Sequence, residues 1–161
     1  MHDMLVKLYD LPSLDEALAV ATRQDVMIRR AIAPEKHAVL DWVRAYFKSS
    51  AAEVETAFAQ VPATCFIAVR DDTMLGFACY DVTSRNFFGP EGVLAEARGR
   101  GIGRGLLLAA LHAQRSQGYA YAIIGGVGPA EFYAKAVGAT IIEGSEPGIY
   151  GTMLRQREKA R

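Results

Sequence analysis

The spacing of apolar residues along the chain separates helical segments from extended ones. Val39, Leu40, Val43 and Phe47 recur at helical intervals. Comparable spacing elsewhere predicts further helices, so that the predicted set covers residues 14–22, 34–47, 51–59, 103–117 and 129–137. Short runs rich in apolar, β-branched and aromatic residues predict strands at residues 4–9, 26–32, 65–70, 74–82, 86–94, 120–125, 140–143 and 149–154.

Turn residues and helix caps mark the boundaries of these elements. Ser50 and Glu53 form a capping-box pattern at the start of the helix at residues 51–59. The tight polar turn at residues 71–73 predicts a β-hairpin between the strands that flank it. Glycine and proline at residues 89–92 interrupt the strand at residues 86–94, which predicts a bulge or a break in its ladder.

The order of the elements predicts an α/β fold of the mixed α+β kind. Strands and helices alternate along most of the chain, which favours a central mixed sheet with helices on both faces. The segment at residues 120–125 is almost entirely apolar, as expected of a strand that is buried on both faces.

Composition narrows the class of protein. With 161 residues, 51% of them hydrophobic, we expect a single domain at residues 1–161, with an N-terminal strand and helix extension at 1–24 and a frayed tail at 155–161. Lys plus Arg and Asp plus Glu number 18 each, so no global field attracts nucleic acid or an anionic membrane. The chain has no apolar run long enough to cross a bilayer and no signal-peptide pattern, so a cytoplasmic location is expected.

The cysteines and histidines of the chain indicate neither a disulfide framework nor a metal site. Cys65 and Cys79 lie in apolar strand-like segments, as expected of buried thiols in a reducing compartment. The three histidines are scattered, so no metal-ligand spacing can be assembled and no metal is expected.

The most informative stretch is a glycine-rich loop that leads from a strand into a helix. Within residues 93–117, Gly99, Gly101, Gly103 and Gly105 alternate with arginines and other residues just before and within the first turn of the predicted helix. Glycine allows backbone to approach a ligand closely, and the first N–H groups of a helix have no intrahelical partner. Together with the helix dipole, these features predict an anion site that suits a phosphate or pyrophosphate.

The spacing of the loop excludes several other phosphate-binding motifs. A P-loop needs a glycine-lysine pair, and the chain has none. A dinucleotide-binding fingerprint would need glycine at Arg104 or at Leu106. What remains is the pattern R-x-x-G-x-G at residues 98–103, placed between a strand and a helix.

In this pattern the sequence resembles the GNAT superfamily of N-acetyltransferases. The resemblance is strongest from Val93 to Gly138, and the order of elements extends it more weakly from about Val26 to the end of the chain. It implies a mostly antiparallel sheet that is splayed at the site of a cosubstrate, acetyl-CoA, with the loop amides on its pyrophosphate and the pantetheine arm beside the preceding strand. The cofactor-binding residues that it implies are Val93, Leu94, Arg98, Gly99, Arg100, Gly101, Ile102, Gly103, Arg104 and Phe132.

The resemblance also implies catalytic roles. A backbone N–H near Val93 or Leu94 would stabilise the oxyanion, and Tyr133 would protonate the leaving thiolate, although core packing is an alternative role for this tyrosine. The glutamate that often acts as base in the family falls at Gly89 here. Glu91 is the candidate in its place, although a solvated loop charge is the simpler interpretation of both Glu91 and Glu96.

Alternatives to a side-chain base remain at this stage, and so do departures from the family pattern. A water relay would serve as base, as would an amine that arrives neutral. Gly125-Gly126 stands where an asparagine is frequent, and four residues rather than three separate Tyr133 from Gly138. Both departures affect the expected geometry of the acid.

The resulting hypothesis is an N-acetyltransferase that moves an acetyl group from the CoA thioester to a primary amine of a small molecule, amino acid or peptide by direct attack. A non-catalytic acyl-CoA-binding or sensing module is the alternative from another class, and a nucleotide-binding protein is a third. The acceptor cleft is expected between residues 34–59, 84–91 and 143–150. The resemblance is also compatible with a homodimer formed through C-terminal strands.

Overall fold

The computed structural model describes residues 1–155, within which the chain forms one seven-stranded sheet. Neighbouring strands follow the order β2-β3-β4-β5-β6-β1-β7. The β5–β6 pair is parallel and the other neighbouring pairs are antiparallel, so the expected mixed, mostly antiparallel sheet is confirmed. The strands are β1 (Met4–Lys7), β2 (Met27–Arg30), β3 (Cys65–Arg70), β4 (Thr73–Tyr80), β5 (Phe87–Val93), β6 (Tyr121–Ile124) and β7 (Thr140–Ile141).

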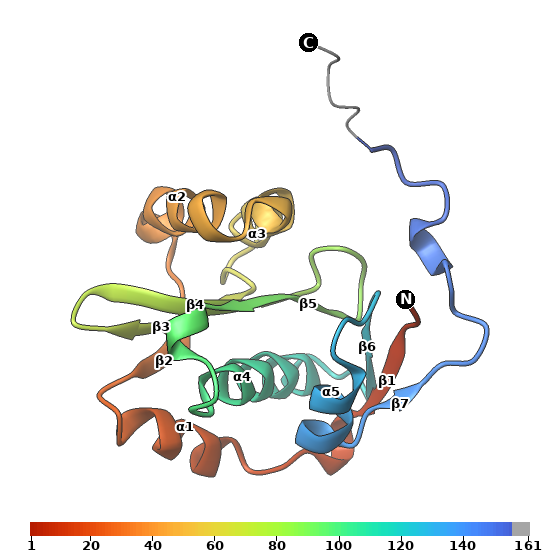
Figure 1. Cartoon of the computed structure of the whole chain (residues 1–161), viewed down its shortest axis with the longest axis horizontal. Coiled ribbons are helices and arrows are strands. Elements are labelled where there is room, and N and C mark those ends of the chain that lie inside the picture. Colours follow the sequence, from red (N-terminus) through yellow and green to blue (C-terminus); the bar gives the residue numbers. More distant parts are fainter. Residues whose placement is uncertain (156–161) are drawn as a thin grey trace.

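Helices cover both faces of the sheet, as expected (Figure 1). Helices α2 and α3 lie on one face, and α1, α4 and α5 lie on the other. Their bounds are α1 (Leu14–Thr22), α2 (Lys36–Tyr46), α3 (Ala51–Ala57), α4 (Ile102–Ser116) and α5 (Ala130–Val137). None of the helices within residues 1–155 is both long enough and apolar enough to span a membrane.

Each face of the sheet has its own hydrophobic core. On the α4 face, Leu106, Leu107 and Leu111 are fully buried against the sheet. On the α2 face, Trp42 packs on a cluster that contains the fully buried Phe77, with the two rings edge to face at 6.2 Å. Aromatic pairs in this geometry add to the free energy of area burial, so Trp42 belongs to the core on this face.

The hairpin and the bulge are both confirmed. Asp71 and Asp72 have φ angles of +49° and +57°, so the turn needs two residues and β4 begins at Thr73. In the β4–β5 ladder, Ala78 pairs with Glu91 and Tyr80 pairs with Phe88, so β5 carries one extra residue in this interval. That extra residue is a β-bulge at the predicted glycine-proline segment.

The sheet opens on the other side of β5. The parallel ladder with β6 holds Phe87 against Ile123 and Phe88 against Ile124, and then ends. Beyond the bulge, β5 continues to Val93 without a β6 partner. The predicted splay therefore begins at the bulge, and the strand diverges toward the glycine-rich loop.

Three details of the predicted secondary structure are wrong. Residues 149–154 form no strand, because Gly148, with φ of +60°, turns the chain into a 3₁₀ helix at Gly148–Tyr150. The strand predicted at residues 140–143 shrinks to Thr140–Ile141. Tyr121 on β6 is 43% exposed, so this strand is not buried on both faces.

The capping box expected at the start of α3 is also absent. The Ser50 side chain caps no backbone N–H. The Glu53 carboxylate is engaged elsewhere, because it accepts a hydrogen bond from the Thr83 hydroxyl on a neighbouring loop. Of the predicted frayed tail at residues 155–161, all but Arg155 lies outside the described residues.

Candidate functional site

The glycine-rich loop has a conformation that requires its glycines. Gly99 and Gly101 have φ angles of +74° and +82°, in the region where a Cβ is strained. A Cβ on Gly101 would also lie 2.9 Å from Cγ1 of Val20. The amide of Gln24 donates a hydrogen bond of 2.8 Å to the Arg100 carbonyl, which ties the loop to the segment after α1. The loop is therefore held in place where α4 begins.

A pocket of about 510 Å³ lies over this loop and the first turn of α4. Its wall combines the loop with β5 and the start of α5. Seven of the cofactor residues implied by the resemblance line it: Val93, Arg98, Gly99, Gly101, Gly103, Arg104 and Phe132.

Three of the implied cofactor residues do not line this pocket. The side chain of Ile102 is 2% exposed and belongs to the core under α4. Leu94 packs partly against the same core, and Arg100 is exposed. Of the three arginines of the loop, Arg98 and Arg104 therefore line the pocket and Arg100 does not.

The backbone of β5 separates the two candidate N–H donors. The Leu94 N–H donates to the Leu75 carbonyl at 2.9 Å and is thereby engaged in the β4–β5 ladder. Val93 is the next residue and pairs with Gly76. Because N–H directions alternate along an antiparallel pair, the Val93 N–H points away from β4 and toward the splay. Of the two, Val93 is the donor placed to meet a ligand there.

Glu91 is the buried acidic group of the same pocket. Its Oε1 atom is buried without a hydrogen-bond partner in the described structure, and it lies 3.5 Å from the position of a Cβ on Gly103. Burial raises the pKa of Glu91 to about 8, and the nearby Tyr133 hydroxyl opposes that shift. The interpretation as a solvated loop charge is therefore wrong for Glu91, whereas Glu96 is exposed.

Tyr133 lies beside Glu91 on the wall of the pocket. Its ring packs edge to face on Phe132 at 5.0 Å and on Phe88 at 6.2 Å. Burial and the negative charge of Glu91 raise the pKa of Tyr133 well above its usual range. The phenol therefore keeps its proton at physiological pH and can act as a hydrogen-bond and proton donor.

The raised pKa of Glu91 predicts how stability depends on pH. The folded protein keeps the Glu91 proton up to about pH 8, whereas the unfolded chain loses it near its ordinary value of 4.5. Between these pH values the folded state binds more protons, so this carboxyl lowers stability as pH rises, by at most about 1.4 kcal/mol per pH unit. We expect Glu91→Gln to raise the melting temperature at pH 8 and to leave it nearly unchanged at pH 4.5.

Thermal melts of the wild type and of Glu91→Gln over this pH range would measure the difference. The exposed neighbour provides the control, since Glu96→Gln should leave the pH profile of stability unchanged. A Glu91→Gln protein with the same pH profile as the wild type would show that the carboxyl ionises normally in the fold.

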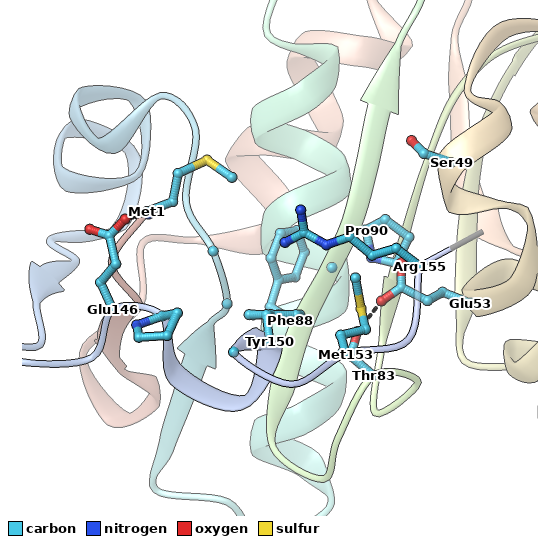
Figure 2. Close-up of a pocket in the computed structure, with 15 residues that line it drawn as sticks. Met1, Ser49, Glu53, Thr83, Phe88, Pro90, Glu146, Tyr150, Met153 and Arg155 are labelled. Atoms are coloured by element: carbon cyan, nitrogen blue, oxygen red, sulfur yellow. Dashed lines mark hydrogen bonds and ion pairs between the residues drawn. The ribbon is translucent and has the colours of Figure 1, made fainter. Parts of the chain in front are cut away.

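A second pocket, of about 630 Å³, begins where the first one ends along β5 (Figure 2). Phe88, Gly89 and Pro90 line this pocket, whereas the next three residues of the strand line the first. The bulge thus lies between two hollows on one strand. The opposite wall comes from the segment after β7, including Glu146 and Tyr150, and Glu53 of α3 lines it as well.

The Gly125-Gly126 pair makes room for Tyr150. A Cβ on Gly125 would collide with the Tyr150 hydroxyl and would lie 2.8 Å from the Phe87 ring. Asp3 fixes the adjoining backbone, because its carboxylate accepts from the Gly126 N–H at 2.8 Å and its own N–H donates to Ser145 Oγ at 2.8 Å. The asparagine of the family pattern is thus replaced by space for a tyrosine from the C-terminal segment.

The three segments from which an acceptor cleft was expected come together at the second pocket, whereas some residues that shape both pockets were not predicted. Each of the three predicted segments contributes a wall to the second pocket, for example through Glu53, Phe88 and Tyr150. Phe47 was not predicted to line the first pocket, and a Cβ on Gly92 would lie 2.7 Å from its ring. Glycine within a strand is a signal for such close approach. Within residues 1–155, no cluster of histidine, cysteine, aspartate or glutamate could hold a metal ion.

Comparison with known proteins agrees with this architecture. Residues 62–136 match the family model of the acetyltransferase (GNAT) domain. No curated protein matches the chain.

Similar solved structures share the fold at low sequence identity. One is the glucosamine N-acetyltransferase region of a fungal multi-domain GH3 β-N-acetylglucosaminidase, with a TM-score of 0.72, 16% identity, and coverage of 88% of this chain and 19% of that protein. Another is a GCN5-related N-acetyltransferase from Sphaerobacter thermophilus, with a TM-score of 0.63, 18% identity, and coverage of 88% and 48%. The chain thus spans less than half the length of each. Residues 62–136 thus match the GNAT acetyltransferase family, and the described residues share the fold of these two solved acetyltransferases.

Proposed function

We propose that the protein is an acetyl-CoA-dependent N-acetyltransferase that acetylates the primary amine of a small molecule. The observation that carries the proposal is the arrangement of two pockets along β5, one at the anion-binding loop and one beyond the bulge. A transferase needs two sites that meet at the reacting atoms, and the bulge provides the meeting point.

The residues of the first pocket fit the phosphate end of the cosubstrate. The first N–H groups of α4 and the guanidinium groups of Arg98 and Arg104 favour an anion there. Gly103 leaves the approach to these N–H groups open, because a Cβ would stand among Glu91, Val93 and Phe132. When bound, acetyl-CoA would supply an activated acetyl thioester.

The residues around the bulge suit the chemistry of acyl transfer. The Val93 N–H faces the splay and would donate a hydrogen bond to an oxyanion. The protonated Tyr133 hydroxyl would donate its proton to a departing thiolate. Glu91 remains the candidate base, and its pKa of about 8 means that the ionised, proton-accepting form gains population in mildly alkaline solution.

The decisive experiment combines cofactor binding with turnover. We expect acetyl-CoA to raise the melting temperature, and we expect at least one member of a panel of primary amines to trigger release of the CoA thiol, which a thiol reagent detects. If acetyl-CoA shifts the melting temperature but no amine in a broad panel releases thiol, the protein is instead a non-catalytic acyl-CoA-binding module. If acetyl-CoA produces no shift at saturating concentration, the cofactor assignment is wrong.

A further inference from the structure

We infer that the second pocket selects an acceptor amine that carries a second positive charge, that is, an aliphatic diamine. This inference rests on the proposed acetyl transfer and assigns the class of acceptor. The inference is based on the distribution of charged residues around this pocket, which has a volume of about 630 Å³.

Carboxylates lie on both sides of this pocket (Figure 2). Glu53 enters from α3, and Glu146 enters from the loop after β7. The Glu53 side chain is fixed, because its Oε1 accepts a hydrogen bond from the Thr83 hydroxyl, drawn as a dashed line in Figure 2. A carboxylate that is already oriented loses less conformational entropy when it binds a cation.

The negative charges of nearby carboxylates act on Tyr150, which lines the pocket. Burial raises the pKa of Tyr150, and the charges of Glu53 and Asp3 raise it further. Asp3 is itself 8% exposed and holds the backbone of this wall. Two carboxylates, Glu53 on α3 and Asp3 before β1, therefore act on the Tyr150 phenol.

Cationic groups of the chain already enter the pocket. The ammonium group of Met1 forms an ion pair with Glu146. The guanidinium group of Arg155 reaches across the hollow in Figure 2, and within residues 1–155 it forms no ion pair. Arg155 belongs to an exposed segment, residues 151–155, from which a ligand cation could displace it.

The remaining surface suits a short methylene chain. Pro90, Tyr150 and Met153 contribute apolar groups between the charged ends. An aliphatic diamine matches this pattern, since one amine would lie toward the bulge on β5 and the other beside Glu53. Arg155 offers the opposite possibility, an acceptor with a carboxylate, and the test below separates the two.

The test uses three acceptors of one length that differ only in the charge of the second group: 1,4-diaminobutane, 4-amino-1-butanol and 4-aminobutanoate. We expect the kcat/KM for CoA thiol release to be highest for the diamine and to exceed that of the amino alcohol by about fivefold, the effect of an ion pair of about 1 kcal/mol. Glu53→Gln should remove this preference, so that the diamine and the amino alcohol react with equal kcat/KM. Glu55→Gln is the matched control, because this exposed residue of α3 does not line the pocket.

Binding of 1,4-diaminobutane to the CoA-loaded protein, measured by calorimetry, separates this inference from the proposed function. Binding that is weakened by Glu53→Gln and not by Glu55→Gln supports the diamine site even where turnover is slow. Equal kcat/KM for the diamine and the amino alcohol, or a preference for 4-aminobutanoate, overturns the inference while acetyl transfer stands. If the diamine neither binds nor releases thiol, the inference is wrong as well.

Discussion

Gly103→Glu is expected to abolish the binding of acetyl-CoA and to leave the fold intact. Gly103 lies in the first turn of α4, and a Cβ there would make ordinary contacts at 3.5–3.9 Å with Glu91, Val93 and Phe132. Its φ angle is helical rather than positive, so a side chain causes no backbone strain. A glutamate side chain would place a carboxylate in the anion site, against both the phosphate groups and Glu91.

Thermal shift measures the loss. Acetyl-CoA at 100 times its dissociation constant should stabilise the wild type by about 2.7 kcal/mol, which corresponds to a rise in melting temperature of roughly 5–10 °C for a chain of this size. The variant should show no rise. Ser116→Glu adds the same charge to an exposed position near the other end of α4 and should keep the full shift. A full shift in Gly103→Glu would show that the cosubstrate lies elsewhere.

The glycine-rich loop was predictable because its conformation depends on local backbone. The alternation of glycine with arginine at residues 98–103 requires only a strand before it and a helix after it, and both are properties of neighbouring residues. The bulge was predictable for the same reason, since Gly89 and Pro90 carry the signal themselves.

The state of Glu91 could not be predicted in this way. Its burial depends on Gly103 and Tyr133, which are distant in sequence and close only in the fold. A charged residue next to glycine and proline has the same local pattern in solvent and in a pocket. Tertiary burial alone distinguishes Glu91 from Glu96.

The strand predicted in the C-terminal segment was wrong for a different reason. The apolar, β-branched and aromatic residues at 149–154 suggested a strand, but a strand also needs a partner edge. In the fold, Tyr150 instead fills the space over Gly125, and the segment becomes a wall of the second pocket. The replacement of the family's asparagine by Gly125-Gly126 was visible in the sequence. That Tyr150 would occupy the resulting space was not.

Tyr133→Phe is expected to lower kcat by about 100-fold and to leave KM for acetyl-CoA within about twofold, as removal of a general acid does. The phenylalanine ring keeps the packing on Phe88 and Phe132, so the pocket should retain its shape. What is lost is the hydroxyl, which stays protonated throughout the neutral pH range because its pKa is raised. Steady-state thiol release with the best acceptor measures both constants.

Tyr150→Phe is the matched control for this role, because it removes a phenol from the second pocket without touching Glu91. It should change KM for the amine more than kcat. If Tyr133 acts as an acid, the need for it should depend on the leaving thiol. The fall in kcat caused by Tyr133→Phe should therefore be smaller with an acyl donor whose thiol leaves without protonation, such as an aromatic thioester. If Tyr133→Phe turns over acetyl-CoA at the wild-type rate, the tyrosine serves only to pack α5 against β5, and the proton must reach the thiolate from water.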